Sequence, residues 1–432
     1  MTDMRTLSTQ KEIEAFLTKL RKRAGSVSPA IIASTTEIIE AVRTGGDAAL
    51  KRYTKRFDGH DRIMLDPRLI KETAEQADRK TVRALRLAAR RIKAFHSRQK
   101  ESTWQYREPG GGIALGQIIR PLERVGVYVP GGTAAYPSTV LMNVIPAQVA
   151  GVPEIAVTVP LPGGVVNPYV MAALEIVGAR EVYCVGGAQA VAALAHGTRT
   201  IRPVDKIVGP GNVYVATAKR LVYGLVDIDM IAGPSEILVI ADKTAEPSFI
   251  AADLLSQAEH DPLASSVLVT DSKTLVGAVR KELERQLAEL PRQKTARESL
   301  KNYGAIVLVS NMTEACDLSN RIAPEHLEVI TKSPRETLKG LKNAGAIFLG
   351  PWTPEPIGDY AAGPNHTLPT GATSRWASPL GVYDFFKRTS LLEFTRKGFM
   401  SLADPVIEIA EREGLTAHAR SVRIRKEEGH IT

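Results

Sequence analysis

The spacing of hydrophobic residues changes near residue 124 of this chain. Before this point apolar side chains recur every three or four positions, as Ile13, Phe16 and Leu20 do. This period predicts that residues 1 to about 120 are mostly helical. Asp47 follows a pair of glycines and marks a favourable place for a helix to start.

After residue 124, short apolar runs alternate with helical segments. Runs that are apolar on both faces and separated by helices predict parallel sheets covered by helices. The predicted fold class is therefore α/β, with two tandem Rossmann-like units that have parallel-type sheets, a helical N-terminal segment and a helical C-terminal tail. The predicted strands cover residues 125–132, 154–160, 181–187 and 206–212 in one series, and 235–242, 265–271, 305–310, 327–331 and 346–350 in another.

Glycine-rich turns follow three strands of the first series. They are Pro130-Gly131-Gly132, Gly186-Gly187 and Gly209-Pro210-Gly211-Asn212. Glycine lets the backbone approach a ligand closely, and a helix N-terminus favours a phosphate. None of the turns is a G-x-G-x-x-G followed by an acidic residue about 20 positions later. Each could be a plain turn, but three at successive strand ends favour a shared nucleotide cleft without the standard fingerprint.

Composition and cysteine content indicate a soluble globular protein. Hydrophobic residues make up 44% and charged residues 24% of the chain, which is ordinary for that class. No apolar run reaches the roughly 18 residues that a membrane span needs, and we expect no signal peptide. Cys184 and Cys316 are the two cysteines, so a disulfide framework is excluded and a reducing cytoplasm is the expected location.

The formal net charge of +9 is concentrated in residues 79–100, a stretch without an acidic residue. Its apolar positions predict an amphipathic helix with a cationic outer face. A solvated face is the favoured interpretation. Nucleic-acid binding is an alternative, but the stretch lacks aromatic residues arranged for stacking and no binding motif follows it. Oligomer contacts or attraction of an anionic cofactor are further alternatives.

Four of the eight histidines lie beside a carboxylate or an amide. Gln257 and His260 are three residues apart near the end of a predicted helix, which places both on one face. An amide oxygen and an imidazole can both bind a divalent metal. Asp359 could supply an anionic ligand from a loop rich in proline and glycine, which also carries His366. A metal site is one interpretation, and ordinary helix and loop positions are the other.

Two further candidate sites involve Glu325, His326 and the chain's tail. Glu325-His326 is an acid next to a base, directly before a predicted strand, and is typical of acid–base catalysis. Glu413 and His418 flank a break at Gly414, and His418 is expected in the first turn of a helix, where the dipole favours a neutral imidazole. Of the other histidines, we expect His60, His96 and His430 on the surface, and His196 to be structural at a helix end.

Long fragments spread over the whole chain resemble the histidinol dehydrogenase family. We find no family motif residue missing. The fragments include GDAALKRYTKRFDG (46–59), RVGVYVPGGTAAYPSTVLMNVIPAQVAGV (124–152), VGGAQAVAALAHGT (185–198), KIVGPGNVYVATAKR (206–220), AGPSEILVIAD (232–242), DLLSQAEHDP (253–262), NRIAPEHLE (320–328), GDYAAGPNHTLPTGATSRWASPLGVYDFFKR (358–388) and EGLTAH (413–418).

The resemblance implies a role for each candidate residue and an order of domains. It implies an N-terminal segment (1–22), a domain with zinc and catalytic residues (23–124 and 236–379), a domain with NAD contacts (125–235) and a helical tail in a dimer contact (380–432). The implied zinc ligands are Gln257, His260, Asp359 and His418, the catalytic pair is Glu325 and His326, and the NAD contacts are Tyr128, Gln189 and Asn212. The implied substrate contacts are Ser235, Gln257, His260, His326, Asp359, His366, Glu413 and His418.

In family terms, the expected reaction is the oxidation of L-histidinol to the aldehyde and then to L-histidine, with two NAD and one zinc per subunit. His326 would take the hydroxyl proton, and Glu325 would assist the addition of water in the second step. The expected enzyme is a cytoplasmic homodimer whose active site takes Glu413 and His418 from the partner, with no nucleic-acid or membrane partner.

Two other functions remain open at this point. A relative that oxidises another small polyol or a sulfonated alcohol would keep the zinc ligands and change the substrate residues. A basic nucleic-acid-binding protein with a degenerate enzyme fold is the second alternative, although binding would not require four dispersed metal ligands.

Overall fold

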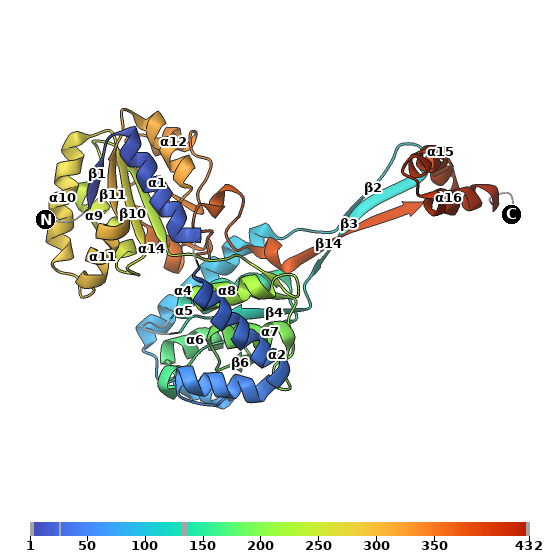
Figure 1. Ribbon diagram of the computed structural model, residues 1–432, viewed down its shortest axis with the longest axis horizontal. Coiled ribbons are helices and arrows are strands. Elements are labelled where there is room, and N and C mark those ends of the chain that lie inside the picture. The colour runs from blue at the N-terminus through green and yellow to red at the C-terminus, as the bar shows by residue number, and fades with distance from the viewer. Residues whose placement is uncertain (1–3, 26, 132–135, 429–432) are drawn as a thin grey trace. The chain divides into compact units, whose positions relative to one another are not determined.

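The computed structural model describes residues 4–25, 27–131 and 136–428, and the chain divides into two compact units (Figure 1). The main unit comprises Met1–Gln99 and Glu123–Phe385, and the second unit comprises Lys100–Leu122 and Phe386–Thr432. None of the described helices is long and apolar enough to cross a membrane.

The main unit contains a six-stranded parallel sheet in the order β1-β11-β10-β9-β12-β13. Strands β9, β10 and β12 are buried along their whole length, as expected for strands covered by helices on both faces. The predicted second strand series is thus present, and β1 adds a parallel edge strand that periodicity did not reveal. The strands are Arg5–Leu7 (β1), Glu236–Ala241 (β9), Ser265–Thr270 (β10), Ala305–Leu308 (β11), His326–Ile330 (β12) and Ala346–Leu349 (β13).

Helices cover both faces of the six-stranded sheet (Figure 1). Phe16 of α1 (Gln10–Gly25) and Leu318 of α12 (Met312–Ile322) share a core with one face. The other face packs against α9 (Pro247–Ala258), α10 (Lys273–Leu287) and α11 (Gln293–Tyr303). The helical spacing of Ile13, Phe16 and Leu20 is therefore the buried stripe of α1.

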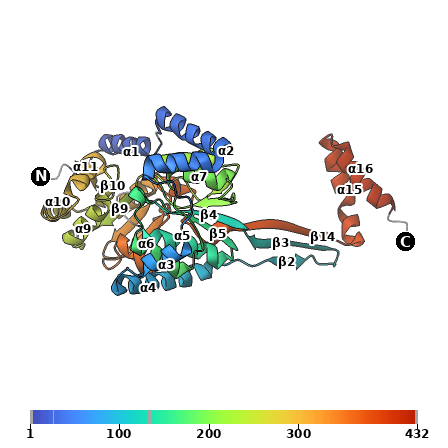
Figure 2. The ribbon, with the colours of Figure 1, turned by 90° about the horizontal axis from the view of Figure 1, so that it is seen from below.

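A second, five-stranded parallel sheet has the order β6-β5-β4-β7-β8. Helices α2, α7 and α8 contribute residues to its core, and α3 and α4 contact α5 and α6. Figure 2 shows α2 beside α7 on one side of β4 and β5, with α3, α4 and α6 on the other. The strands are Arg124–Tyr128 (β4), Glu154–Thr158 (β5), Glu181–Tyr183 (β6), Lys206–Val208 (β7) and Asp227–Ile228 (β8), and the helices are Pro29–Asp58 (α2), Pro67–Ala74 (α3), Arg79–His96 (α4), Pro137–Ala150 (α5), Pro168–Val177 (α6), Gly187–His196 (α7) and Val213–Val222 (α8).

The expected grouping of residues 23–124 with the domain that carries the candidate catalytic pair stays a prediction, because α4 contacts helices of the five-stranded sheet and also the segment Gly358–Ala362. Helix α2 contacts α7 and α8, α3 contacts α6, and α4 contacts α5 and α6 of the five-stranded sheet. Helix α2 is interrupted at Gly46, whose φ of 51° and ψ of −135° are not helical. The second half of α2 therefore begins beside Asp47, as the sequence predicts.

The second unit contains strands that the sequence did not indicate. Strands β2 (Trp104–Arg107), β3 (Ile113–Pro121) and β14 (Phe386–Phe394) form an antiparallel sheet in the order β14-β3-β2. Residues 1 to about 120 are mostly helical, as predicted, but β2 and β3 depart from this pattern. Periodicity did not indicate β2 because all of its residues are exposed, so it has no buried alternating face. Helices α15 (Arg396–Arg412) and α16 (Thr416–Glu428) then flank Gly414, as expected for the tail.

Short elements complete the connections of the main unit. The segment Glu355–Ile357 (α14) leads directly into a π-helical turn at Gly358–Ala362 (η3), which is a form often found at functional sites. The remaining elements are α13 (Pro334–Leu338) and the 3₁₀ turns Ser97–Gln99 (η1), Pro162–Gly164 (η2), Thr373–Arg375 (η4) and Val382–Phe385 (η5).

Candidate active site

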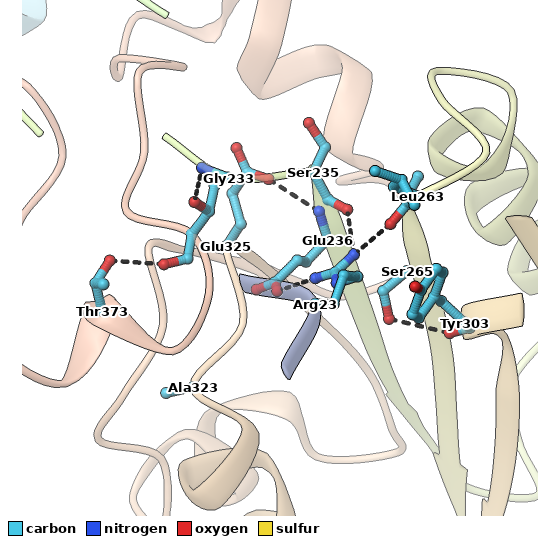
Figure 3. A network of polar contacts seen from close by, with 12 residues as sticks. Arg23, Gly233, Ser235, Glu236, Leu263, Ser265, Tyr303, Ala323, Glu325 and Thr373 are labelled. Carbon is cyan, nitrogen blue, oxygen red and sulfur yellow. Dashed lines mark hydrogen bonds and ion pairs between the residues drawn. The ribbon is translucent and has the colours of Figure 1, made fainter. Parts of the chain in front are cut away.

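Glu325 and His326 lie at the amino end of β12, next to the start of β9. Parallel pairing places His326 opposite Ile237, so the candidate catalytic pair adjoins the preceding residue, Glu236. The Glu236 N–H donates to Oε2 of Glu325 over 2.9 Å, and Nδ1 of His326 is 2.9 Å from the Glu236 carbonyl oxygen. One residue of β9 thus holds both members of the pair through its backbone, and Figure 3 shows its contact with Glu325.

The Nε2 atom of His326 faces two carboxylates. It lies 3.5 Å from Oδ1 of Asp359 and 3.9 Å from Oε1 of Glu355, and it is buried without a hydrogen-bond partner among the described residues. Because the Glu236 carbonyl can only accept, Nδ1 carries a proton. In a neutral ring, Nε2 is then the basic nitrogen.

Burial and charge give the site strongly shifted acidities. Burial raises the pKa of Glu325 to about 7, and burial together with the charge of Asp359 raises the pKa of Glu355 to about 8. Burial alone would lower the pKa of His326, but the charges of Glu325 and Asp359 outweigh it and raise this pKa to about 10. Burial opposes ionisation of Asp359 too, yet His326 lowers the pKa of this carboxyl to about 2. Such shifts are typical of functional sites.

His326, Glu355 and Asp359 form a cluster that could hold a metal ion. Within the described ranges, one ligand atom of each lies within 4.8 Å of the others. Sequence reasoning missed Glu355, although an acid four residues before Asp359 in the same loop was a visible signal. Its position follows from α14, whose first N–H, that of Glu355, donates to Oε1 of Glu328 over 2.7 Å.

Gln257 and His260 approach this cluster from the end of α9. Gln257 is 1% exposed, and its Oε1 has no hydrogen-bond partner in the described part of the chain. Partial desolvation lowers the pKa of His260 although part of the ring is exposed, and the charge of Asp359 opposes this effect. Ser256, next to Gln257, donates to Oε2 of Glu355 over 3.3 Å. The structure therefore brings the end of α9 to the acidic loop.

Of the other predicted substrate residues in the main unit, His366 adjoins the acidic loop and Ser235 adjoins Glu236. His366 is half-buried, with Nδ1 3.1 Å from the Asp359 carbonyl oxygen and Nε2 3.5 Å from Oγ1 of Thr139. Ser235 directly precedes Glu236 and is also half-buried. Glu413 and His418, at the end of α15 and in the first turn of α16, are exposed residues of the second unit, and their contribution to the site stays a prediction.

The expected NAD contacts lie at or just past the ends of β4, β6 and β7. Tyr128 is 4% exposed, and its hydroxyl accepts a hydrogen bond from the Gly187 N–H over 3.1 Å. Gln189 is buried in α7, with Oε1 unpaired among the described residues. Exposed Asn212 caps α8 by accepting from the N–H groups of Tyr214 and Val215. The glycine turn at Gly131 continues into residues 132–135, which lie outside the described residues.

Two of the histidines expected on the surface are not exposed. His96 is completely buried, and its Nδ1 lies 2.8 Å from the Ile92 carbonyl oxygen. This expectation was wrong because α4 turns its last residue towards Asn365 of the active-site loop, 3.5 Å away. His60 is half-buried, and His430 lies outside the described residues.

A buried acid–base pair beside converging carboxylates, at the amino end of an interior strand of a parallel sheet covered by helices, is the arrangement of an α/β enzyme. The family model for histidinol dehydrogenase matches residues 21–426 of this chain. The chain therefore belongs to the histidinol dehydrogenase family and is an enzyme of that family.

Individual relatives agree with this membership. The chain is 52% identical to the histidinol dehydrogenase of Aquifex aeolicus, over 94% of this chain and 95% of that one. It is 50% identical to the enzyme of Clostridium acetobutylicum, over 95% and 96% of the two chains. The crystal structure of histidinol dehydrogenase from Elizabethkingia anophelis superposes with a TM-score of 0.94 at 34% identity, covering 100% of this chain and 99% of that chain.

Proposed function

We propose that the chain oxidises L-histidinol to L-histidine in two NAD-dependent steps, with one zinc ion per subunit. The observation that carries this proposal is the orientation of His326. Its Nδ1 is engaged by the Glu236 backbone, and its buried Nε2 lies beside Asp359 without a hydrogen-bond partner among the described residues. An oriented imidazole of this kind suits removal of a hydroxyl proton.

The donor set suits zinc. Gln257 presents a buried, unpaired amide oxygen at the end of α9, and such an atom is costly to bury without a partner. Gln257, His260 and Asp359, with His418 from a second subunit, would hold the ion. Bound zinc would orient the substrate's amine and imidazole nitrogens and offset the negative charge that raises the pKa of His326.

In the first oxidation, His326 Nε2 takes the hydroxyl proton as the hydride leaves the neighbouring carbon. Bound NAD would accept the hydride in each oxidation, from a cleft bordered by Tyr128, Gln189 and Asn212. In the second oxidation, Glu325 accepts a proton from the water that adds to the aldehyde. Ser235 and His366, with Glu413 of a second subunit, would contact the substrate, whose positive charge suits the carboxylates around it.

Metal analysis combined with activity tests this proposal. Purified protein should contain about one zinc per subunit and reduce NAD with histidinol. A chelator should abolish both properties, and added zinc should restore them. Dihydroxypropane sulfonate serves as the competing substrate. Activity with that alcohol and none with histidinol, or full activity without metal, would contradict the proposal.

A further inference from the structure

Arg23 lies in the last turn of α1 and places a buried guanidinium next to the candidate active site. Its side chain is 1% exposed and forms an ion pair with the Glu236 carboxylate, which is 9% exposed. Nη1 donates to the Leu263 carbonyl oxygen over 2.6 Å and lies 3.5 Å from that of Ser235. Figure 3 shows Arg23 between these groups. One side chain therefore binds both the Glu236 carboxylate and the backbone carbonyl of Leu263, in the loop before β10.

The residue that Arg23 clamps is the one that holds the catalytic pair. The Glu236 N–H contacts Glu325, and the Glu236 carbonyl contacts Nδ1 of His326. The side chain of Glu236 extends to Arg23 instead of into the site. The position of the Glu236 backbone, and with it the direction of both catalytic side chains, thus depends on where Arg23 fixes this side chain.

Stability alone does not explain a charged pair at this position. Replacing a buried ion pair by well-packed apolar residues is often neutral or stabilising, whereas removing one partner is strongly destabilising. Beside Glu236, the side chains of Leu17, Leu20 and Ile322 lie together with those of Arg21 and Arg321, so an apolar pair would find some apolar neighbours. The planar guanidinium of Arg23 donates hydrogen bonds in fixed directions, so it holds the Glu236 side chain in one position, which an apolar pair cannot do.

We infer that Arg23 and Glu236 are positioning residues for the oxidation chemistry, because their ion pair fixes the backbone that orients Glu325 and His326. This inference rests on the proposed function. By this inference the last turn of α1 helps to hold the active site in place. Catalytic groups stay aligned only when the residues that support them are held rigidly.

The test compares Arg23→Met, Glu236→Gln and the double variant Arg23→Gln/Glu236→Gln, which leaves no unpaired buried charge. Glu14→Gln is the control, because Glu14 pairs α1 with Arg321 of α12 through exposed side chains. The measurements are kcat and KM for histidinol and NAD, zinc content, Tm, and the downfield Nδ1–H proton signal of His326. That signal is identified by its loss in His326→Asn.

We expect kcat to fall at least about tenfold in all three variants, because small displacements of catalytic groups have large effects on rate. KM for NAD, zinc content and the control should stay unchanged. The Nδ1–H signal should shift or broaden in the variants and not in Glu14→Gln. Arg23→Lys, which keeps the charge without the fork, should recover part of the rate.

A double variant with wild-type kcat and an unchanged Nδ1–H signal would overturn the inference. So would losses of kcat that simply follow the folded fraction. An unmodified enzyme that fails to oxidise histidinol would instead refute the proposed function, while the proton signal would still report whether the ion pair orients His326.

Discussion

Glu325 and His326 are adjacent in sequence, yet their surroundings differ in ways that suit the separate roles proposed for them. Burial raises the pKa of Glu325 to about 7, so the carboxylate and the acid coexist near neutral pH. His326 is held through Nδ1 and presents Nε2 to the acidic loop. Groups with separated acidities and fixed directions suit different proton transfers.

The pH dependence of aldehyde oxidation should reflect Glu325. Its charged form is the base, so kcat/KM for supplied histidinol aldehyde should fall as pH decreases through about 7. Glu325→Gln should lower this rate and remove that limb of the profile, while His326→Asn should abolish oxidation of the alcohol. Equal losses in both steps for both variants would contradict the division of roles.

Gly209 is a second residue-scale test, at the turn that leads to Asn212. Its φ is +112°, and an added Cβ would lie 2.1 Å from the Tyr128 carbonyl oxygen. Gly224 has a similar φ of +102° but open space around it, so Gly224→Ala should cost only the strain of about 1–3 kcal/mol. Gly209→Ala should lower Tm further and raise KM for NAD. If both variants changed Tm and KM for NAD by the same amounts, the close approach of Gly209 to the Tyr128 carbonyl oxygen would be unimportant.

The candidate ligands show what residue patterns can reveal. The three-residue spacing of Gln257 and His260 indicated a shared helix face, but α9 ends at Ala258 and His260 lies in the turn that follows, with its N–H donating to the Gln257 carbonyl oxygen over 3.2 Å. Glu355 was missed because its relevance depends on α14 and η3 turning it towards His326. His96 was misplaced because polar neighbours in sequence do not show which face of α4 is covered.

At the scale of elements, one arginine joins the starts of three strands. Arg124 of β4 donates to Glu154 of β5 over 2.9 Å and to Glu181 of β6 over 2.8 Å. Its side chain is 7% exposed, so each carboxylate partly compensates a buried charge. The ion pairs fix the amino ends of the strands whose opposite ends lead to the glycine turns.

The contribution of Glu181 should depend on pH. The hydrogen bond from Arg124 lowers the pKa of Glu181, so its stabilisation is complete above the unfolded pKa of about 4.3 and is lost as pH falls through the lower folded pKa. Glu181→Gln should cost about 1–3 kcal/mol at pH 7, and the difference should shrink in acid. Urea denaturation at both pH values measures it. The exposed pair of Glu40 and Arg43 is the control, and Glu40→Gln should change little.

The hydrophobic pattern of the sequence did not predict two whole strands, β3 and β14. Strands β3 and β14 pair over nine positions, from Phe386 with Pro121 to Phe394 with Ile113, but β14 is largely exposed. A strand without a buried face has no period-two hydrophobic signal. By contrast, β9 and β10 were predicted correctly because both of their faces are covered by helices.

At the scale of the whole molecule, the proposed sharing of His418 between subunits can be tested by mixing two inactive variants. In a mixed dimer of His326→Asn and His418→Ala, one site would combine the intact His326 of one chain with the intact His418 of the other. Random exchange should restore about a quarter of wild-type activity, because half of the dimers are mixed and each has one intact site. Total zinc should not change on exchange, because His326→Asn keeps all four proposed ligands and the share of intact His418 residues is the same before and after mixing.

No recovery after proven subunit exchange would mean that His418 acts within its own chain or not at all. His418→Ala alone should lose zinc while its Tm, measured against zinc-free wild type, stays the same. The side chain is exposed at the start of α16, so its removal leaves no cavity and should not unfold the tail.

The sequence by itself determined the α/β class, the alternation of helices with strands of parallel sheets, and the chemical identity of the candidate groups. These follow from periodicity and residue type, which are local properties. Tertiary structure decided which of those groups meet. Only the pairing of β12 with β9 places the Glu236 backbone between Glu325 and His326, and only folding brings Arg23 from residues far earlier in the chain to hold it. Such contacts depend on the burial and register of distant segments, which no local pattern encodes.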